Sequence, residues 1–239
     1  MRQKLVLIFI LALGSLVSRG QERQAAFEMN QRLGRGINMG NAFEAPTETD
    51  WGNPWKPEYF RIMAELGFRH VRVPVRWETA ARSSAAPPYT IQASFLARIR
   101  QVVDTALKYK LHVILNMHHH DEIFTNPDGV KPRFLSQWMQ IAEYFKNYDE
   151  RVVFEVMNEP HDGLNADKWN VFFADALSEI RKVSKTRAVL IGTSPWGGLS
   201  GVSSLKIPND ANLILTVHYY DPFNFTHQGA EWVGADANN

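Results

Sequence analysis

The chain contains no cysteine at any of its 239 positions. Disulfide bonds, thiol nucleophiles and zinc sites with cysteine ligands are therefore excluded. An excess of charge of one sign is also missing, because 26 basic and 25 acidic residues leave a formal net charge of +1. This balance argues against nucleic acid or an anionic membrane surface as a partner. With 45% hydrophobic and 12% aromatic residues, the composition fits one sizeable globular domain.

A long apolar run occurs only near the N-terminus, from Leu5 to Leu13. Two basic residues precede it, and small residues at Ser18 and Gly20 follow it. This order predicts a signal peptide over residues 1–20, and therefore a secreted protein, periplasmic or extracellular, whose mature domain covers residues 21–239. A membrane anchor is the alternative, but the run is shorter than the roughly 20 residues that span a bilayer. After cleavage we expect no membrane association.

Short segments rich in β-branched residues alternate with helical patterns along the rest of the chain. These segments are apolar on both faces or nearly so, as strands of a covered parallel sheet are. The expected strands are residues 35–39, 70–75, 112–117, 152–157, 188–193 and 213–218. The main helices expected between them are residues 57–66, 94–109, 132–145 and 167–183.

This alternation fits two α/β architectures, the doubly wound sheet and the eight-stranded barrel. The glycine-rich phosphate turn that a dinucleotide-binding sheet needs after its first strand is missing. Polar residues instead cluster just past the C-terminal ends of several strands, where barrel enzymes hold their active sites. We therefore predict a (β/α)8 TIM barrel, incomplete in the sequence given, with about six of the eight βα units.

Polar and aromatic side chains follow each of the predicted strands. The ends of parallel strands meet at one rim of a barrel, so these residues are expected to form one pocket. In chain order they are Asn38, Asn41, Glu44, Arg72, His118, His119, His120, Asn158, Glu159, Trp196, His218, Tyr220, His227 and Trp232.

The strongest signal among them is FEVMNEPH, in which a buried strand ends in Asn158 and Glu159. A glutamate at a barrel mouth, held protonated by low polarity and a nearby second carboxylate, acts as a general acid. The neighbouring amide suits a sugar hydroxyl, since it both donates and accepts. Alternatively, Asn-Glu-Pro only turns the chain into the next helix. The surrounding rim residues favour the catalytic interpretation.

Seven stretches together resemble glycoside hydrolase family 5, the cellulase and mannanase family, and within it thermophilic bacterial endo-β-1,4-glucanases. They are GRGINMGNAFEAP, WGNP, HVRVPVRW, VILNMHHH, FEVMNEPH, LIGTSPWGG and VHYYDPFNFTHQGAEW. The resemblance runs from about Phe27 to the last residues. It implies a hydrolase that cleaves internal β-1,4 linkages of glucan, glucomannan or mannan with retention, without metal or cofactor, and that is a monomer when complete.

The resemblance also implies roles for the rim residues. Glu159 matches the acid/base. Its active-site shell is matched by Arg72, His118, Asn158, His218 and Tyr220, and the sugar-contacting positions by Asn41, Glu44, His119, His227 and Trp232. Trp196 and Trp232 offer flat faces on which a pyranose can stack.

The family's nucleophile is a glutamate at the end of a seventh strand, and the sequence given holds no such strand or motif. A retaining hydrolase needs two carboxyls about 5–5.5 Å apart. Glu231 is the one late glutamate, but it lies in a loop that matches substrate contacts, so we do not expect it to substitute. We interpret the sequence as truncated before the nucleophile, and its activity by itself is doubtful.

Two other functions are weighed against this one. An inactive or glycan-binding fragment would explain the missing nucleophile. A metal-dependent hydrolase would use His118 and His120 as a His-x-His pair, although such enzymes carry that pair on the first strand rather than the third.

For several residues a structural role competes with a functional one. Arg72 is expected to be structural as well as catalytic, and Trp138 and Trp169 to belong to the core. Trp51 and Trp55 either stack on sugar or close the barrel.

Overall fold

A computed structural model describes residues 24–230 and residue 233 of the chain. Six parallel strands form one sheet in which every strand pairs with its neighbours in sequence. They are β1 (Gly36–Asn38), β2 (His70–Val73), β3 (His112–Asn116), β4 (Val152–Glu155), β5 (Val189–Ile191) and β6 (Leu213–Leu215). This order is the one in which the strands of a (β/α)8 barrel follow one another.

All six predicted strands are confirmed, but each is shorter than expected. The apolar sequence continues past the last paired residue: residues 152–157 were expected to be extended, and pairing ends at Glu155. The extra residues carry the chain from the sheet into the loops at the C-terminal end. The predicted signal peptide, residues 1–20, lies outside the described residues.

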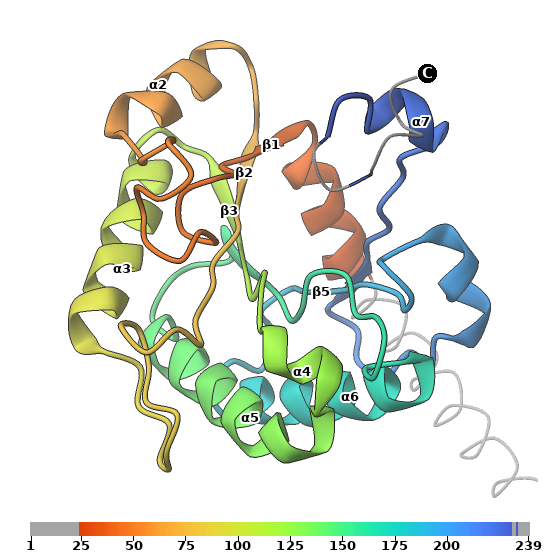
Figure 1. Cartoon of the computed structure of the whole chain (residues 1–239). Coiled ribbons are helices and arrows are strands. Elements are labelled where there is room, and N and C mark those ends of the chain that lie inside the picture. The colour runs from red at the N-terminus through yellow and green to blue at the C-terminus, as the bar shows by residue number, and fades with distance from the viewer. Residues whose placement is uncertain (1–23, 231–232, 234–239) are drawn as a thin grey trace, which may run out of the picture.

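Four longer helices lie in an arc around the outer side of the sheet (Figure 1). They are α2 (Pro57–Glu65), α3 (Ala93–Lys108), α5 (Pro127–Tyr144) and α6 (Ala166–Val183). Shorter elements follow three of the strands, namely α4 (Asp121–Thr125), the 3₁₀ helix η1 (Leu199–Ser204) and α7 (Phe223–Thr226). Within the described residues, no helix is both long and apolar enough to span a bilayer.

The start of α5 corrects the expectation of a helix over residues 132–145. The helix begins five residues earlier, at Pro127, and the side chain of Asn126 caps it by accepting a hydrogen bond of 3.3 Å from the N–H of Gly129. Pro132 therefore lies inside the helix, close to its start. Proline suggests a helix start in the sequence because its missing N–H is tolerated best there.

Side-chain alternation along the strands separates the hydrophobic core from the polar interior. In β3 and β4, Val113, Leu115, Val152 and Phe154 belong to the main core cluster with the helices. The residues that alternate with them point to the inner face of the sheet, where Asn116 pairs in register with Glu155. Trp138 and Trp169 are fully buried in the core, as predicted.

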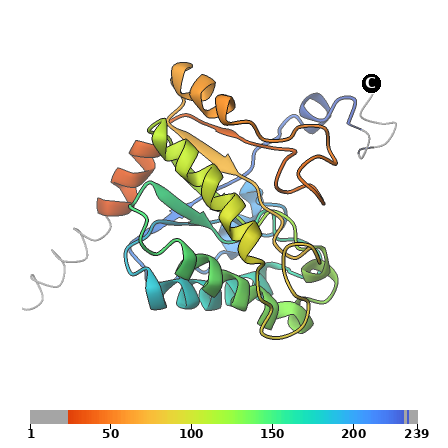
Figure 2. The same ribbon diagram turned by 90° about the vertical axis from the view of Figure 1, so that its left-hand side faces the viewer.

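A helix of residues 24–33, which the sequence analysis did not predict, packs on the inner face of the sheet. Met29 and Leu33 are buried in a second cluster with inward residues of β3 to β6, among them Ile114, Val153 and Ile214. Figure 2 shows this helix at one end of the sheet and α7 at the other. The site at the C-terminal strand ends is therefore open on the side away from this helix.

Candidate active site

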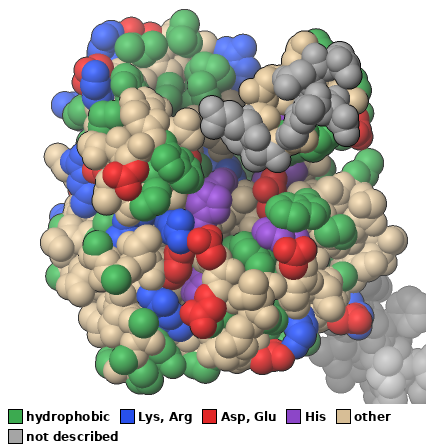
Figure 3. Space-filling view, in the orientation of Figure 1, with side chains coloured by type: hydrophobic (Ala, Val, Ile, Leu, Met, Phe, Trp, Pro, Cys, Tyr) green, Lys and Arg blue, Asp and Glu red, His purple; other side chains and the backbone are tan. Residues whose placement is uncertain are grey.

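Glu159 follows β4 and lies beside His218, which follows β6. Its Oε1 atom is 2.6 Å from His218 Nδ1, and Asn158 Nδ2 donates to its Oε2 at 3.4 Å. The Glu159 and His218 side chains keep 25% and 17% of their surface exposed. Figure 3 shows histidine side chains gathered in a hollow of this face, with acidic and apolar side chains beside them. The carboxyl of Glu159 is therefore held in one orientation and remains accessible from the hollow.

The pKa of Glu159 is shifted in the direction opposite to the one expected. Burial favours the neutral acid, but the hydrogen bond from His218 and the charges of His218 and Arg72 outweigh it, so the pKa lies below its usual range. The expectation that low polarity and a second carboxylate keep Glu159 protonated is therefore wrong for the described residues. The described surroundings therefore favour the ionised form of Glu159, and its protonated form needs a further negative charge nearby.

The imidazole of His218 can reach Glu159 because the residue of the β5 loop that lies beside it is a glycine, Gly197. The N–H of His218 donates to the carbonyl of Gly197 at 2.8 Å. Gly197 has a φ of +68°, and a Cβ there would lie 3.1 Å from the imidazole ring. Glycine is therefore required at this position both for its backbone and for the space it leaves.

Arg72 on β2 connects three strands on the inner face of the sheet. Its Nε and Nη2 donate to the two carboxylate oxygens of Glu155 at 2.6 Å each, and Nη2 also donates to Asn158 Oδ1 at 2.9 Å. Nη1 donates to Asn38 Oδ1 on β1 at 3.2 Å. Glu155 was missed in the sequence analysis, although it is the charged residue of the apolar strand VVFE. The expected structural role of Arg72 is confirmed by this ion pair.

His118 lies next to this network. Its Nδ1 is 3.3 Å from Asn116 Nδ2, which itself is 3.4 Å from Glu155. Burial, with the nearby positive charge of Arg72, lowers the pKa of His118 to about 2. The imidazole is therefore neutral at any physiological pH and offers a donor and an acceptor rather than a charge.

The loop after β1 brings Asn41, Glu44 and Trp51 toward the same end. Asn41 has a φ of +66°. Glu44 is buried, and its carboxylate accepts the N–H groups of Asn41 and Ala42. This contact stabilises the loop, and sugar binding by Glu44 stays a prediction.

The two tryptophans of this loop differ in position. Trp55 is buried in the core against Phe43 and Phe60, so it closes the barrel. Trp51 is 45% exposed, with its ring centroid 6.0 Å from that of His119. Of the two interpretations, sugar stacking is open to Trp51 alone.

Aromatic side chains surround the other side of the hollow. Tyr220 lies edge-on to His218 and to His227, at centroid distances of 6.3 and 5.0 Å. Burial and the charge of Glu159 raise the pKa of the Tyr220 phenol, so it stays a neutral donor. Trp196 is 53% exposed, which leaves a ring face open to solvent. The predicted residue Trp232 lies outside the described residues, as does Glu231.

His118 and His120 do not form a metal pair. His118 faces the hollow, whereas His120 is fully buried and its ring nitrogens have no hydrogen-bond partner among the described residues. Among the residues that the structure describes, no three His, Asp or Glu side chains converge as metal ligands would. The geometry therefore gives the metal-dependent alternative no support.

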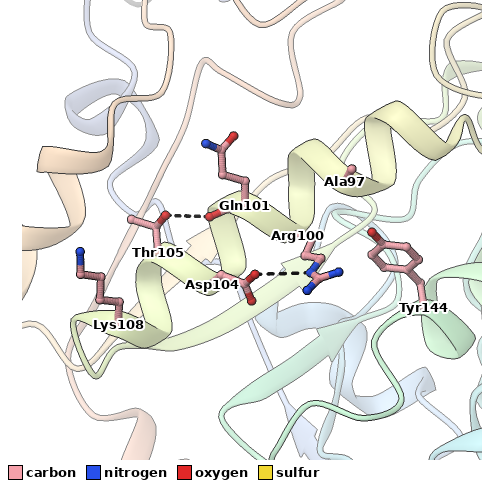
Figure 4. Close-up of a pocket in the computed structure, with 7 residues that line it drawn as sticks. All are labelled: Ala97, Arg100, Gln101, Asp104, Thr105, Lys108 and Tyr144. Atoms are coloured by element: carbon pink, nitrogen blue, oxygen red, sulfur yellow. Dashed lines mark hydrogen bonds and ion pairs between the residues drawn. The ribbon is translucent and has the colours of Figure 1, made fainter.

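A separate shallow pocket lies over α3 and Tyr144 of α5, away from the strand ends (Figure 4). Its polar groups are satisfied locally, by Arg100 and Asp104 at 3.4 Å and by Thr105 with the carbonyl of Gln101 at 2.7 Å. This pocket has one aromatic residue, Tyr144, and its ion pair of Arg100 and Asp104 is exposed, unlike the buried charges around Glu159.

Comparison with known proteins places these observations among cellulases. The profile of the family described as cellulase (glycosyl hydrolase family 5) matches residues 35–239. Endoglucanase H of Acetivibrio thermocellus is 41% identical over 202 residues, which are 84% of this chain and 22% of that protein. The cellulase/esterase CelE of the same organism is 33% identical over 92% of this chain and 30% of its own length. The chain thus spans about a fifth to a third of these curated relatives.

Solved structures agree with that comparison. Thermotoga maritima Cel5A in complex with mannotriose has a TM-score of 0.86 and 48% identity, over 88% of this chain and 68% of that one. The cellulose synthase subunit Z of Clostridioides difficile has a TM-score of 0.80 and 34% identity, over 84% of this chain and 66% of that one.

Proposed function

This chain belongs to glycosyl hydrolase family 5, and we propose that it cleaves internal β-1,4 linkages of glucan, glucomannan or mannan with retention of configuration. The observation that carries the proposal is the contact of Glu159 with His218 at 2.6 Å, in a hollow lined by histidine and aromatic side chains. Structures of Thermotoga maritima Cel5A hold cellobiose and mannotriose, which supports both glucan and mannan as substrate classes.

Glu159 serves in this proposal as the acid/base. In its protonated form it donates to the oxygen of the leaving sugar, and in its ionised form it takes a proton from the water that releases the product. Because His218 lowers the pKa of Glu159, the ionised form that the second role needs is populated. The first role requires a nearby negative charge that raises the pKa, and a carboxylate nucleophile supplies it. The resemblance assigns that nucleophile to a seventh strand, beyond β6.

The neighbouring side chains complete the site. Arg72, fixed by Glu155, points its remaining N–H groups toward Asn38 and Asn158, and its charge favours a carboxylate in the hollow. His118, neutral because it is buried, and Asn158 hydrogen-bond to sugar hydroxyls. Asn41, Glu44, His119, Trp196, His227 and Trp232 contact further sugars.

Localisation is part of the same proposal. A polymer such as cellulose is hydrolysed outside the cytoplasm, and the charged, apolar and small residues of the first 20 positions support export by a signal peptide. We propose a monomer that needs neither metal nor organic cofactor, since two carboxyls carry all the proton and covalent chemistry.

The test is a Glu159→Gln variant of the full-length protein on carboxymethylcellulose and glucomannan. We expect hydrolysis to fall by about 10²–10⁴-fold, with an unchanged melting temperature because Glu159 faces the hollow. Glu143→Gln is the control, since Glu143 is exposed on α5 and pairs only with Lys146.

Product analysis tests the remaining parts of the proposal. Proton NMR of the first products should show the β-anomer, and EDTA should leave the rate unchanged. Full activity of Glu159→Gln, an inverted anomer, or hydrolysis limited to α-linked glucans would overturn the proposed function.

A further inference from the structure

The imidazole of His161 lies between two aromatic rings that come from different loops. Phe124 of α4 stacks on one side, with ring centroids 3.7 Å apart and planes inclined by 24°. Trp196, after β5, stacks on the other side at 3.5 Å and 12°. The three rings thus form one stack, and the exposed indole of Trp196 is its outermost layer.

His161 also contacts the backbone of Glu159. Its Nδ1 is 2.6 Å from the carbonyl oxygen of Glu159. A carbonyl oxygen only accepts hydrogen bonds, so Nδ1 must carry the proton and act as the donor. The ring is therefore fixed in its plane by Phe124 and Trp196, and along its edge by Glu159.

Both Glu159 and Trp196 have left-handed backbone conformations, with φ of +44° and +56°. Residues with a side chain rarely adopt this region, and they hold it only where the surroundings fix it. Here both residues depend on the same short segment. The N–H of Trp196 donates to the carbonyl of Pro160 at 2.9 Å, and the next residue, His161, donates to Glu159.

We propose that His161 is a positioning residue that links a sugar stacked on the open face of Trp196 to the orientation of Glu159 during proton transfer. This inference rests on the proposed function. A sugar that covers Trp196 limits the movement of the indole and, through it, of the imidazole beneath. The imidazole in turn holds the carbonyl of Glu159, and so restrains the backbone from which the Glu159 side chain projects.

Two substitutions separate the stacking of His161 from its hydrogen bond. His161→Phe keeps a planar ring between Phe124 and Trp196 but has no donor for Glu159. His161→Asn removes the ring but places its amide nitrogen close to the position of Nδ1, so the donor is retained. Both variants are made in the full-length protein and compared on aryl cellobiosides of graded leaving-group pKa and on cello-oligosaccharides.

We expect His161→Phe to lower kcat/KM for cello-oligosaccharides by about tenfold to a hundredfold, as the displacement of an acid by a fraction of an ångström does. Its kcat/KM should also depend more steeply on the leaving-group pKa, because poor leaving groups need the proton most. His161→Asn should keep the wild-type dependence and instead raise the KM for cello-oligosaccharides several-fold, because the platform beneath Trp196 is lost.

His70→Asn is the matched control. His70 makes the same kind of contact, with its Nδ1 2.8 Å from the carbonyl of Leu33. It lies at the N-terminal end of β2, away from the site. This variant should show the wild-type dependence on leaving-group pKa even if its melting temperature falls. An identical dependence in wild type and His161→Phe would overturn the proposal, as would equal effects of the Phe and Asn substitutions on both kinetic constants.

If His161→Phe does not fold, a measurement on a protein that retains His161 still tests the proposal. In a Glu159→Gln protein with ¹⁵N-labelled histidine, the Nδ1 proton resonance of His161 should shift when cellotetraose binds, and an unchanged resonance at saturation counts against the link. If Glu159→Gln is fully active, the proposed function itself fails. If it is inactive and His161→Phe behaves like wild type, only the role of His161 fails.

Discussion

Arg72 binds Glu155 through two parallel hydrogen bonds of 2.6 Å, from Nε to Oε2 and from Nη2 to Oε1. Only 13% of the Arg72 side chain and 2% of the Glu155 side chain are exposed. Such a two-point contact fixes the plane of the guanidinium. The remaining donors of Arg72 then meet Asn158 and Asn38, so Glu155 sets the geometry of the site without lying next to Glu159 itself.

Removal of Glu155 is expected to cost both stability and activity. In Glu155→Ala the buried guanidinium loses its partner, which lowers the free energy of unfolding by about 3–5 kcal/mol. Urea unfolding followed by circular dichroism measures this loss. The double variant Arg72→Met, Glu155→Leu should regain much of the stability, because no buried charge is left, yet remain inactive. A stable and active Glu155→Ala protein would contradict the role given to this pair.

The contact of His218 with Glu159 predicts a shift in the pH profile. Burial favours the neutral form of Glu159, and the hydrogen bond and charge of His218 oppose it. His218→Phe removes the opposing contribution, so the pKa of Glu159 should rise. The alkaline limb of the kcat/KM profile, where the acid loses its proton, should therefore move to higher pH. His218→Gln, which keeps a donor but carries no charge, should give a smaller shift. A limb that stays in place or moves to lower pH is the contrary result.

Buried His120 predicts a loss of stability in mild acid. Burial and the nearby Arg133 lower its pKa to about 4, whereas an unfolded histidine titrates near 6.5. The folded state thus holds His120 neutral while the unfolded state takes up a proton. Its contribution to the free energy of unfolding is complete above pH 6.5, declines by about 1.4 kcal/mol per pH unit below it, and has fallen by about 3 kcal/mol near pH 4.

His120→Leu should therefore flatten the dependence of stability on pH between 6.5 and 4, as measured by urea unfolding at a series of pH values. His227→Leu, at a half-buried position on the opposite side of the hollow, serves as the control and should follow the wild-type curve. If His120→Leu and wild type lose stability in parallel over this range, His120 is not held neutral in the folded state.

The six strands were predictable because a buried parallel strand is recognisable in sequence as a short, mainly apolar run rich in β-branched residues. The ends of the strands were not, since residues such as Val156 and Met157 are as apolar as the paired ones. Pairing stops there because the backbone turns toward the site. The helix of residues 24–33 escaped prediction because its buried face is narrow, and Met29 and Leu33 are its main core residues.

The site was predictable where a residue lies on a strand, as Arg72 does, or a few residues past its end, as Glu159 does. It was not where a role depends on partners brought in by folding. The pKa of Glu159 is lowered by His218, 59 positions away, whereas low polarity and a second carboxylate were expected to raise it. His161 is the last residue of FEVMNEPH, but the motif gives it no role, because its importance comes from contacts with Phe124 and Trp196. Glu155 looked like one charge in an apolar strand until Arg72 was placed opposite it.

Strand order in the sheet has a consequence for the time course of folding. Each strand from β1 to β6 pairs with the one made just before it, so pairing can follow synthesis without waiting for distant segments. The helix of residues 24–33 is the exception. It is made before β1, but Met29 and Leu33 are buried against side chains of β3 to β6, the last of which leaves the ribosome about 180 residues later, a time of roughly 9–36 s at 5–20 residues per second. During that interval the helix of residues 24–33 keeps its apolar face in water, which makes it a natural binding site for chaperones of newly made proteins.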